Sequence, residues 1–203
     1  KPLGKETINT GWMFMNFNTD KRSIAVNMNV PSAHGFVRSL IQQSDVVIDN
    51  FGVDPTPKWG MSAEQLLELR PDLIVVKCSV AGRTGPQRNF VGLGNSIMAM
   101  SGITALSGFE GQPPVATCTA HPDYSSNAHH ALFAILAALY HRSRNGKGQI
   151  IDLSQVESTI AFNGPAILDY SVNGVAGDPI RNRHPQMAPH GVFTCSCDDR
   201  RIH

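Results

Sequence analysis

Short, almost entirely apolar segments alternate along the chain with segments of helical periodicity, and this alternation restricts the fold more than any other feature of the sequence. Residues 45–50 (DVVIDN) have a continuous apolar centre, and residues 73–80 (LIVVKCSV) are apolar at six of eight positions. Such runs are typical of strands buried on both faces of a parallel sheet. Residues 23–28 (SIAVNM) and 150–154 (IIDLS) are predicted to be two further strands.

Amphipathic segments lie between these strands. Residues 62–70 begin with Ser62, a helix-capping residue, and stop before Pro71. Residues 31–43 carry an apolar helical face made of Phe36, Val37, Leu40 and Ile41. Further helices are predicted around 97–100 and over 155–163. Strands and helices in this order predict an α/β fold, a Rossmann-like and mostly parallel sheet with flanking helices.

The composition changes near residue 172. Residues 1–171 carry the strand and helix pattern and are predicted to form one large α/β domain. Residues 172–203 are rich in Pro, Gly, His and Asn. They are therefore predicted to be a linker and the beginning of a small second domain.

Charge and hydropathy exclude several classes of partner. The 203 residues include 17 basic and 16 acidic side chains, so no general attraction to nucleic acid or to an anionic membrane is expected. The apolar runs are shorter than the ~20 residues of a membrane-spanning helix, and KPLGKETINT lacks the apolar core of a signal peptide. These features predict a cytoplasmic protein with neither a nucleic-acid nor a membrane partner.

Common nucleotide and metal motifs are absent from the sequence. GRTGP, VGLG and NGKG lack the spacing of a phosphate-binding loop or of GxGxxG. The histidines form no HExxH motif, and the four cysteines form no CxxC unit, so neither a metal site nor a disulfide framework is indicated. Cys78, inside an apolar strand, is predicted to be a buried small residue rather than a nucleophile.

Asp123 lies just before the longest helical pattern, and two interpretations of it are open. The apolar face of this helix consists of Ala128, Ala131, Leu132, Ile135, Leu136, Leu139 and Tyr140. Asp123, Ser125 or Ser126 could cap the helix by accepting a free backbone N–H of its first turn. The local pattern alone favours a cap over a catalytic carboxylate.

Three stretches together resemble the family III CoA-transferases, which include formyl-CoA and carnitine CoA-transferases and the related alpha-methylacyl-CoA racemases. They are FNTDKRSIAVNM, DVVIDNFG and PDYSSNAHHALFAILAALYHRSRNGKGQIIDLSQVES. Their order and spacing agree with the family from about Phe17 to Gly191. Each motif is weakly specific by itself, but the ordered set is strongly specific.

The resemblance implies that Asp123 is the catalytic residue. A carboxylate at this position would attack an acyl-CoA thioester and form a mixed anhydride, and CoA would then be carried as an aspartyl thioester to an incoming carboxylic acid. The implied substrates are an acyl-CoA and a carboxylic acid. No metal and no tightly bound cofactor is implied.

The resemblance also implies a site for CoA at two carboxyl ends of strands, where open α/β sheets bind ligands. In the family, one strand end and an Asn-Phe pair contact CoA, and an arginine near the position of Lys58 meets a CoA phosphate. Lysine would serve there as a point charge. The implied CoA-contacting residues are Val26, Asn27, Met28, Asn29, Asn50, Phe51, Gly52 and Lys58.

Family members form interlocked dimers, so a homodimer is implied. The family also has a strand-helix unit ahead of Lys1, and a small domain and a returning segment beyond His203. We therefore expect this chain to be an incomplete core of the large CoA-binding and catalytic domain, with weak or no turnover by itself.

Two other functions compete with CoA transfer. Racemases of the family use a histidine with the aspartate as an acid–base pair, but Leu93 stands at the histidine position and cannot accept a proton. The other alternative is a non-catalytic, CoA-binding or self-associating fragment. Exchange of CoA between acyl donors by the purified protein would distinguish this alternative from a transferase.

Overall fold

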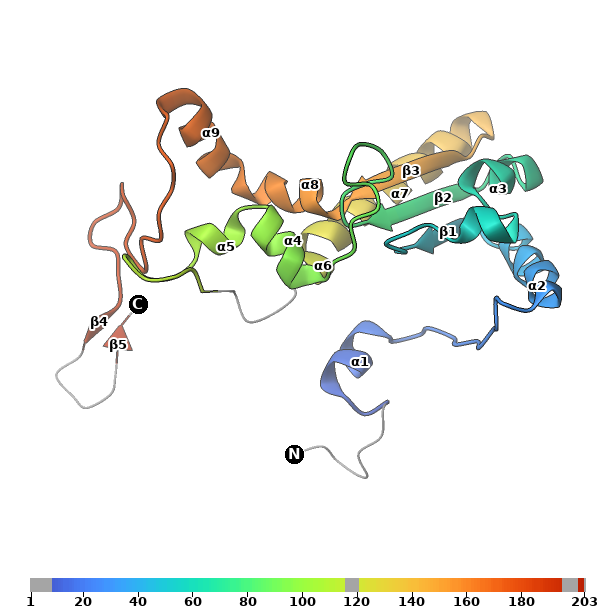
Figure 1. The fold of residues 1–203 in the computed structure, drawn as a ribbon, viewed down its shortest axis with the longest axis horizontal. Helices are drawn as coiled ribbons and strands as arrows, with labels where there is room; N and C mark the ends of the chain where they lie inside the picture. Colours follow the sequence, from blue (N-terminus) through green and yellow to red (C-terminus); the bar gives the residue numbers. More distant parts are fainter. Residues whose placement is uncertain (1–8, 116–120, 195–200, 203) are drawn as a thin grey trace. The chain divides into compact units, whose positions relative to one another are not determined.

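A computed structural model of the protein describes residues 9–115, 121–194 and 201–202 (Figure 1). The chain divides into two compact units, Lys1–Val37 and Arg38–His203. Helix α2, Pro31–Gln42, matches the helix predicted there and contains the boundary between the units.

The unit Lys1–Val37 contains α1, Trp12–Phe17, and the beginning of α2. The prediction of a buried strand at residues 23–28 was wrong, because this segment has no regular structure and the side chain of Ile24 is 60% exposed. A strand needs a neighbouring strand to satisfy its backbone groups, and no described strand pairs with this segment.

Three parallel strands form the centre of the unit Arg38–His203. They are β1, Val46–Asp49, β2, Ile74–Ser79, and β3, Gln149–Ser154, in the order β1-β2-β3. Every residue of β2 is buried. The predicted α/β fold with a parallel sheet is therefore confirmed.

Helices cover this sheet. Helix α3, Ala63–Leu69, begins as predicted at Ser62, whose hydroxyl accepts the N–H of Gln65 while the Gln65 side chain accepts the N–H of Ser62. The long helix α7, Ser126–Asn145, packs on β2 and β3. The remaining helical elements are η1, Thr56–Trp59, α4, Gly94–Met100, α5, Ile103–Leu106, α6, His121–Tyr124, α8, Gln155–Ile160, η2, Ala161–Asn163, and α9, Gly164–Asn173.

Helix α7 buries a narrower face than the sequence pattern predicts. Ala131, Ile135 and Leu139 pack against the core formed by β2. The other four residues of the predicted face remain exposed, namely Ala128, Leu132, Leu136 and Tyr140. The described part of the chain covers only one side of this helix.

The turn from α7 into β3 sets the direction of the helix. Gly146 closes α7 in the left-handed conformation, with φ of 71°. Gly148 passes so close to β2 that an added Cβ would lie 1.9 Å from the carbonyl oxygen of Leu73. Because β3 starts directly after this turn, α7 runs antiparallel to the strands, and its first residues lie at the carboxyl edge of the sheet.

The chain leaves the α/β pattern after α9. Residues 174–192 contain neither helix nor strand, and a short antiparallel pair follows, β4, Phe193–Thr194, with β5, Arg201–Ile202. The domain boundary at residues 171 and 172 stays a prediction. Within the described residues, no helix has the length and apolarity needed to cross a membrane, and the location in the cytoplasm stays a prediction.

Candidate active site

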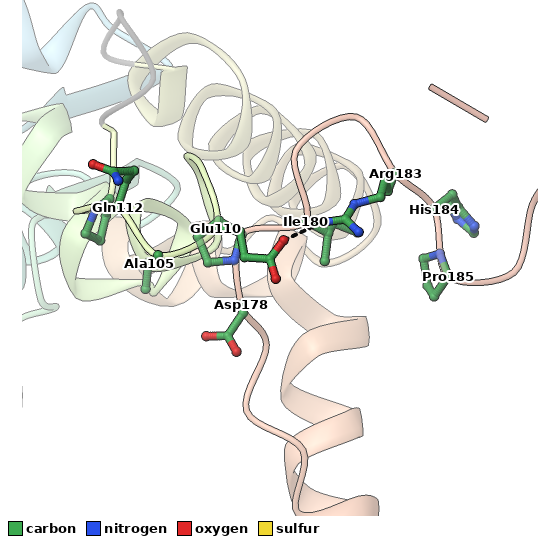
Figure 2. Close-up of a pocket in the computed structure, with 11 residues that line it drawn as sticks. Ala105, Glu110, Gln112, Asp178, Ile180, Arg183, His184 and Pro185 are labelled. Carbon is green, nitrogen blue, oxygen red and sulfur yellow. Dashed lines mark hydrogen bonds and ion pairs between the residues drawn. The ribbon is translucent and has the colours of Figure 1, made fainter. Parts of the chain in front are cut away.

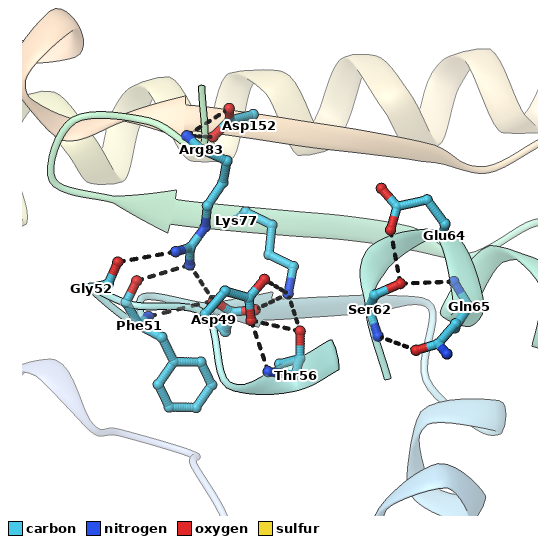
Figure 3. A network of polar contacts seen from close by, with 11 residues as sticks. Asp49, Phe51, Gly52, Thr56, Ser62, Glu64, Gln65, Lys77, Arg83 and Asp152 are labelled. Carbon is cyan, nitrogen blue, oxygen red and sulfur yellow. Dashed lines mark hydrogen bonds and ion pairs between the residues drawn. The ribbon is translucent and has the colours of Figure 1, made fainter. Parts of the chain in front are cut away.

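A row of charged side chains crosses the carboxyl half of the sheet. Asp49 of β1 lies opposite Lys77 of β2, and Lys77 lies opposite Asp152 of β3 (Figure 3). The carboxyl edge of a parallel sheet is where α/β proteins usually bind ligands. This row therefore marks the first part of the candidate site.

Lys77 is the buried centre of this row, with only 3% of the residue exposed. Its Nζ lies 2.7 Å from Oδ2 of Asp49 and 3.2 Å from Oδ2 of Asp54, and it donates to Oγ1 of Thr56 at 2.9 Å. Burial alone would raise the pKa of Asp54, but hydrogen bonds from Thr56 and the charge of Lys77 together lower it below its ordinary value. The ammonium and carboxylate groups thus neutralise each other away from water.

Arg83, in the loop after β2, joins the same network. Its guanidinium donates to Oδ1 of Asp49 at 3.1 Å, to the carbonyl of Phe51 at 2.8 Å and to the carbonyl of Gly52 at 3.1 Å. Its backbone N–H donates to the carboxylate of Asp152 at 2.9 and 3.1 Å. The loop after β2 is therefore tied to the ends of both neighbouring strands (Figure 3).

Four of the predicted CoA-contacting residues come together beside this network. Asn50, Phe51 and Gly52 form the turn after β1, and Lys58 is an exposed residue of η1. The ring of Phe51 lies edge-on to the ring of Trp59, with centroids 5.8 Å apart, which joins the turn to η1.

The other four predicted CoA-contacting residues belong to the unit Lys1–Val37, where three lie in residues 23–28, the segment that is not a strand, and the fourth comes directly after it. The side-chain oxygen of Asn27 accepts the N–H of Asn29, and the carbonyl of Asn27 accepts the N–H of Val30. The carbonyl of Met28 lies 2.9 Å from Nε2 of His34. Val26, Asn27, Met28 and Asn29 thus lead through a turn into α2.

Asp123, the predicted catalytic residue, lies in the short helix α6, two residues before the N-cap position of α7. Its side chain is exposed and makes neither a hydrogen bond nor an ion pair with another described residue. Partial burial raises the pKa of its carboxyl group. This direction is opposite to the effect of a helix N-terminus on a carboxylate.

The interpretation of Asp123 as a helix cap is not supported. The N-cap position of α7 belongs to Ser125, and no side chain donates or accepts the capping bond there. The hydroxyl of Ser125 instead donates to the carbonyl of His121 at 2.7 Å. Asp123 therefore has no capping role that would account for its position.

Buried polar contacts hold the segment around Asp123 in place. Pro122 is fully buried, and the hydroxyl of Ser126 lies 3.0 Å from that of Thr159 in α8. Asn127 accepts a hydrogen bond from Ser158 of the same helix. Because α8 continues directly from β3, these contacts anchor Asp123 at the carboxyl edge of the sheet, the edge that also carries the Asn50–Phe51–Gly52 turn.

Two cavities lie in the unit Arg38–His203 near charged residues. One, of about 450 Å³, is lined by Asp54, Lys77 and Arg83 among others, and adjoins the network at the strand ends. The other, of about 700 Å³, lies between α5 and residues 178–185, with an ion pair between Glu110 and Arg183 at its rim (Figure 2). None of the predicted site residues, all of which the structure describes, lines either cavity.

Cys78 is buried as predicted. Burial raises the pKa of its thiol to about 11, with a further contribution from the charge of Asp49. Cys118, Cys195 and Cys197 lie outside the described residues. Among the described residues, no group of three His, Cys, Asp or Glu side chains is placed to hold a metal ion.

The sequence analysis missed Asp49, Lys77 and Arg83. A signal was present for the first two, since each is the one charged residue of its strand, and buried charges are rare unless they are paired. Their pairing depends on strand register, which the sequence pattern does not specify. Arg83 carried no local signal, because its partners lie more than 30 residues away in the chain.

Comparison with known proteins identifies the family of this chain. A model of CoA-transferase family III matches residues 3–203. The chain is 33% identical to a succinyl-CoA–D-citramalate CoA-transferase of Chloroflexus aurantiacus over 86% of its own length and 43% of that protein. It is also 33% identical to an acetyl-CoA:oxalate CoA-transferase of Acetobacter aceti, over 87% of its own length and 45% of that protein.

The fold is shared as well. The crystal structure of a CAIB/BAIF family protein from Brucella suis matches with a TM-score of 0.80 and 30% identity, over 86% of this chain and 46% of that one. The chain thus spans about half the length of the relatives it matches. Since the family model matches nearly every residue, the chain belongs to CoA-transferase family III.

Proposed function

We propose that the protein carrying this chain moves CoA from an acyl-CoA to a carboxylic acid through a covalent intermediate on Asp123. The observation that carries the proposal is the position of this carboxylate. It is exposed and has no partner among the described residues, on a segment anchored by buried contacts at the carboxyl edge of the sheet. A nucleophile needs both accessibility and a fixed position.

The proposed reaction balances without any further reagent. An oxygen of the Asp123 carboxylate attacks the thioester carbonyl, the carbon–sulfur bond breaks, and CoA leaves as the thiolate. The thiolate attacks the aspartyl carbonyl and releases the donor acid, leaving an aspartyl-CoA thioester. The acceptor carboxylate displaces CoA to form a second anhydride, and CoA then attacks the new acyl carbonyl and frees Asp123.

Binding of CoA is proposed at the turn formed by Asn50, Phe51 and Gly52, with Lys58 meeting a phosphate. The network of Lys77 and Arg83 beside this turn supports the assignment, because it fixes backbone at the edge where α/β sheets bind ligands. In the unit Lys1–Val37, Val26, Asn27, Met28 and Asn29 are each proposed to contact CoA. For the chain by itself we infer weak or no turnover.

Replacing Asp123 by Asn tests the proposal. In a preparation active in CoA transfer, Asp123→Asn should fold normally and lose transfer by at least about 10³-fold, as removal of a covalent nucleophile does. The matched control is Asp169→Asn, which changes an exposed carboxylate on α9 and should keep wild-type activity. Mass spectrometry after acyl-CoA and hydroxylamine should find modification at Asp123 alone. Near-normal transfer by Asp123→Asn would contradict the proposal.

Self-association is a second part of the proposal. Helix α7 leaves apolar side chains exposed that a second copy could cover, namely Leu132, Phe133, Leu136 and Tyr140. Light scattering at ~20 μM, a range that detects micromolar association, should give twice the mass of the chain. A monomer at that concentration would count against a homodimer.

Racemase activity is not proposed for this chain. Leu93, at the position of the racemase histidine, is the N-cap residue of α4, and its side chain is exposed. A leucine can neither donate nor accept the proton that racemisation requires.

A further inference from the structure

We propose that Arg83 is a positioning residue that holds the Asn50–Phe51–Gly52 turn in the form that binds CoA. This inference rests on the proposed function, since it assumes that the turn contacts CoA. The inference goes beyond the proposed function by assigning CoA affinity to a side chain outside the turn, one that follows η1, α3 and β2 in the chain.

The acceptors of the Arg83 guanidinium all belong to the turn or to the residue before it. They are the carbonyls of Phe51, at 2.8 Å, and Gly52, at 3.1 Å, and Oδ1 of Asp49, at 3.1 Å. The same carboxylate oxygen of Asp49 accepts the N–H of Phe51 at 3.4 Å. Because one rigid, planar group holds two consecutive carbonyls, it fixes the orientation of the two peptide groups that follow Phe51 and Gly52.

The backbone of Arg83 is itself held in place, and this fixes the position from which the side chain reaches the turn. The carboxylate of Asp152 accepts the N–H of Arg83 with both oxygens, at 2.9 and 3.1 Å. Gly82, with φ of 81°, turns the chain in a conformation that other residues avoid. The position of the turn after β1 thus depends on β3 through Arg83.

Gly52 also lies close to the side chain of Val91. A Cβ added at Gly52 would lie 2.9 Å from Cγ2 of Val91. Loss of the hydrogen bonds from Arg83 would release the carbonyls of Phe51 and Gly52 and allow the turn to move. Such a movement would shift the exposed faces of Asn50 and Phe51 that are proposed to meet CoA.

The contacts of Arg83 are not those of a side chain optimised for stability alone. Its Nε–H is buried with no acceptor among the described residues, and an unsatisfied buried donor costs stability. Buried ion pairs are also weak evidence for a stabilising role. A role in holding the geometry of the turn would explain why a guanidinium occupies this position although its Nε–H is left without an acceptor.

Arg142 provides a closely matched control at the other edge of the sheet. The side chains of Arg83 and Arg142 are 17% and 19% exposed. Arg142 also donates to two carbonyls, those of Asp45 and Asp72, at 3.4 and 3.3 Å, and to Oδ1 of Asp45 at 3.0 Å. Asp45 and Asp72 precede β1 and β2, so these contacts lie at the amino ends of the strands, away from the proposed site.

Calorimetric titration with CoA tests the inference without requiring turnover. The variants are Arg83→Met, Arg83→Lys and Arg142→Met, each measured at a temperature where circular dichroism shows it to be folded. We expect the Kd for CoA to rise about tenfold or more in Arg83→Met, a change of ~1.4 kcal/mol. Arg83→Lys should also bind more weakly, because an ammonium keeps the charge but cannot hold both carbonyls. Arg142→Met should bind CoA as the wild type does.

Each other outcome overturns the inference. Equal losses of CoA affinity in Arg83→Met and Arg142→Met would show that Arg83 contributes only to the stability of the fold. Wild-type affinity in Arg83→Lys would show that Arg83 acts only through its positive charge, by attracting an anion. A wild-type protein that does not bind CoA would remove its premise. Failure of the proposed function is a separate result, since Asp123→Asn tests transfer while this titration tests binding.

Discussion

Replacing Lys77 by Met removes the one buried ammonium at the carboxyl edge of the sheet within the described residues. Asp54 and Thr56 then lose the cation that lies 3.2 and 2.9 Å from them, and Asp49 loses its 2.7 Å ion pair. Methionine has nearly the same length and no charge, so it fills the space without replacing these contacts. The free energy of unfolding should therefore fall, because the carboxylates of Asp49 and Asp54, with side chains 12% and 25% exposed, lose a cation that water replaces only in part.

The size of the loss can be worked out from the partners that remain. Removing one member of a buried ion pair costs about 3–5 kcal/mol. Asp49 keeps the guanidinium of Arg83 at 3.1 Å, and the side chain of Asp54 is 25% exposed and can be partly hydrated. Both facts favour the lower end of that range. We expect Lys77→Met to destabilise the protein by about 3 kcal/mol.

Urea unfolding at pH 7, followed by circular dichroism, measures this loss. Lys147→Met removes an exposed lysine in the turn after α7 and should change the free energy of unfolding by less than about 0.5 kcal/mol. Asp54→Asn in the Lys77→Met background should recover part of the loss, because it removes one of the unpaired carboxylates.

The pH dependence gives an independent check with a definite sign. The pKa of Asp54 lies below its ordinary value of 3.8, so its interactions stabilise the folded state above that pH and are lost as the pH falls through the lower, folded value. The difference in stability between wild type and Lys77→Met should therefore narrow below pH 3.8. A loss under about 1 kcal/mol at pH 7, the size of an exposed ion pair, would refute the reasoning.

Three further predictions follow from the same structure. Gly148→Ala should lower the free energy of unfolding in urea by about 3 kcal/mol or more, because its Cβ would lie 1.9 Å from a backbone oxygen. Gly146→Ala should lower it by only about 1 kcal/mol, because Gly146 has φ of 71° but open space around it. Equal losses in the two variants would contradict the close approach at Gly148. Cys78, with a thiol pKa of about 11, should resist iodoacetamide at pH 8 until the protein unfolds, and labelling of its peptide in the native protein would show that it is accessible. Burial raises the pKa of Asp123, and the carboxylate is the reactive form of this side chain. On acidification, kcat/KM for CoA transfer should therefore begin to fall at a pH above 3.8, the ordinary pKa of an aspartate. A value of kcat/KM that stays constant down to pH 3.8 would contradict this assignment.

Much of the sheet and its helices could be predicted because their signals are local. The apolar runs of β1 and β2, the cap at Ser62 and the period of α7 each depend on residues within a few positions of one another. The strand predicted at residues 23–28 failed for the opposite reason. A strand exists only where another strand pairs with it, and an apolar pattern does not supply that partner.

The candidate site divides in the same way. Asp123 and the Asn50–Phe51 pair could be identified from ordered motifs, but whether Asp123 caps α7 depended on the geometry of the junction between α6 and α7. The sequence pattern also did not predict that part of the apolar face of α7 stays exposed. A helical period identifies an apolar face but not the residues that cover it.

By itself, then, the sequence determined the helices and strands whose signals lie within a few neighbouring residues, such as α7 and the apolar runs of β1 and β2. Only the tertiary structure decided that Asp49, Lys77 and Asp152 face one another and that Arg83 holds the turn after β1. These contacts join residues roughly 30 to 70 positions apart, and they form only when the parallel strands take one register. Buried charges need partners, and the register of the sheet determines which partners they find.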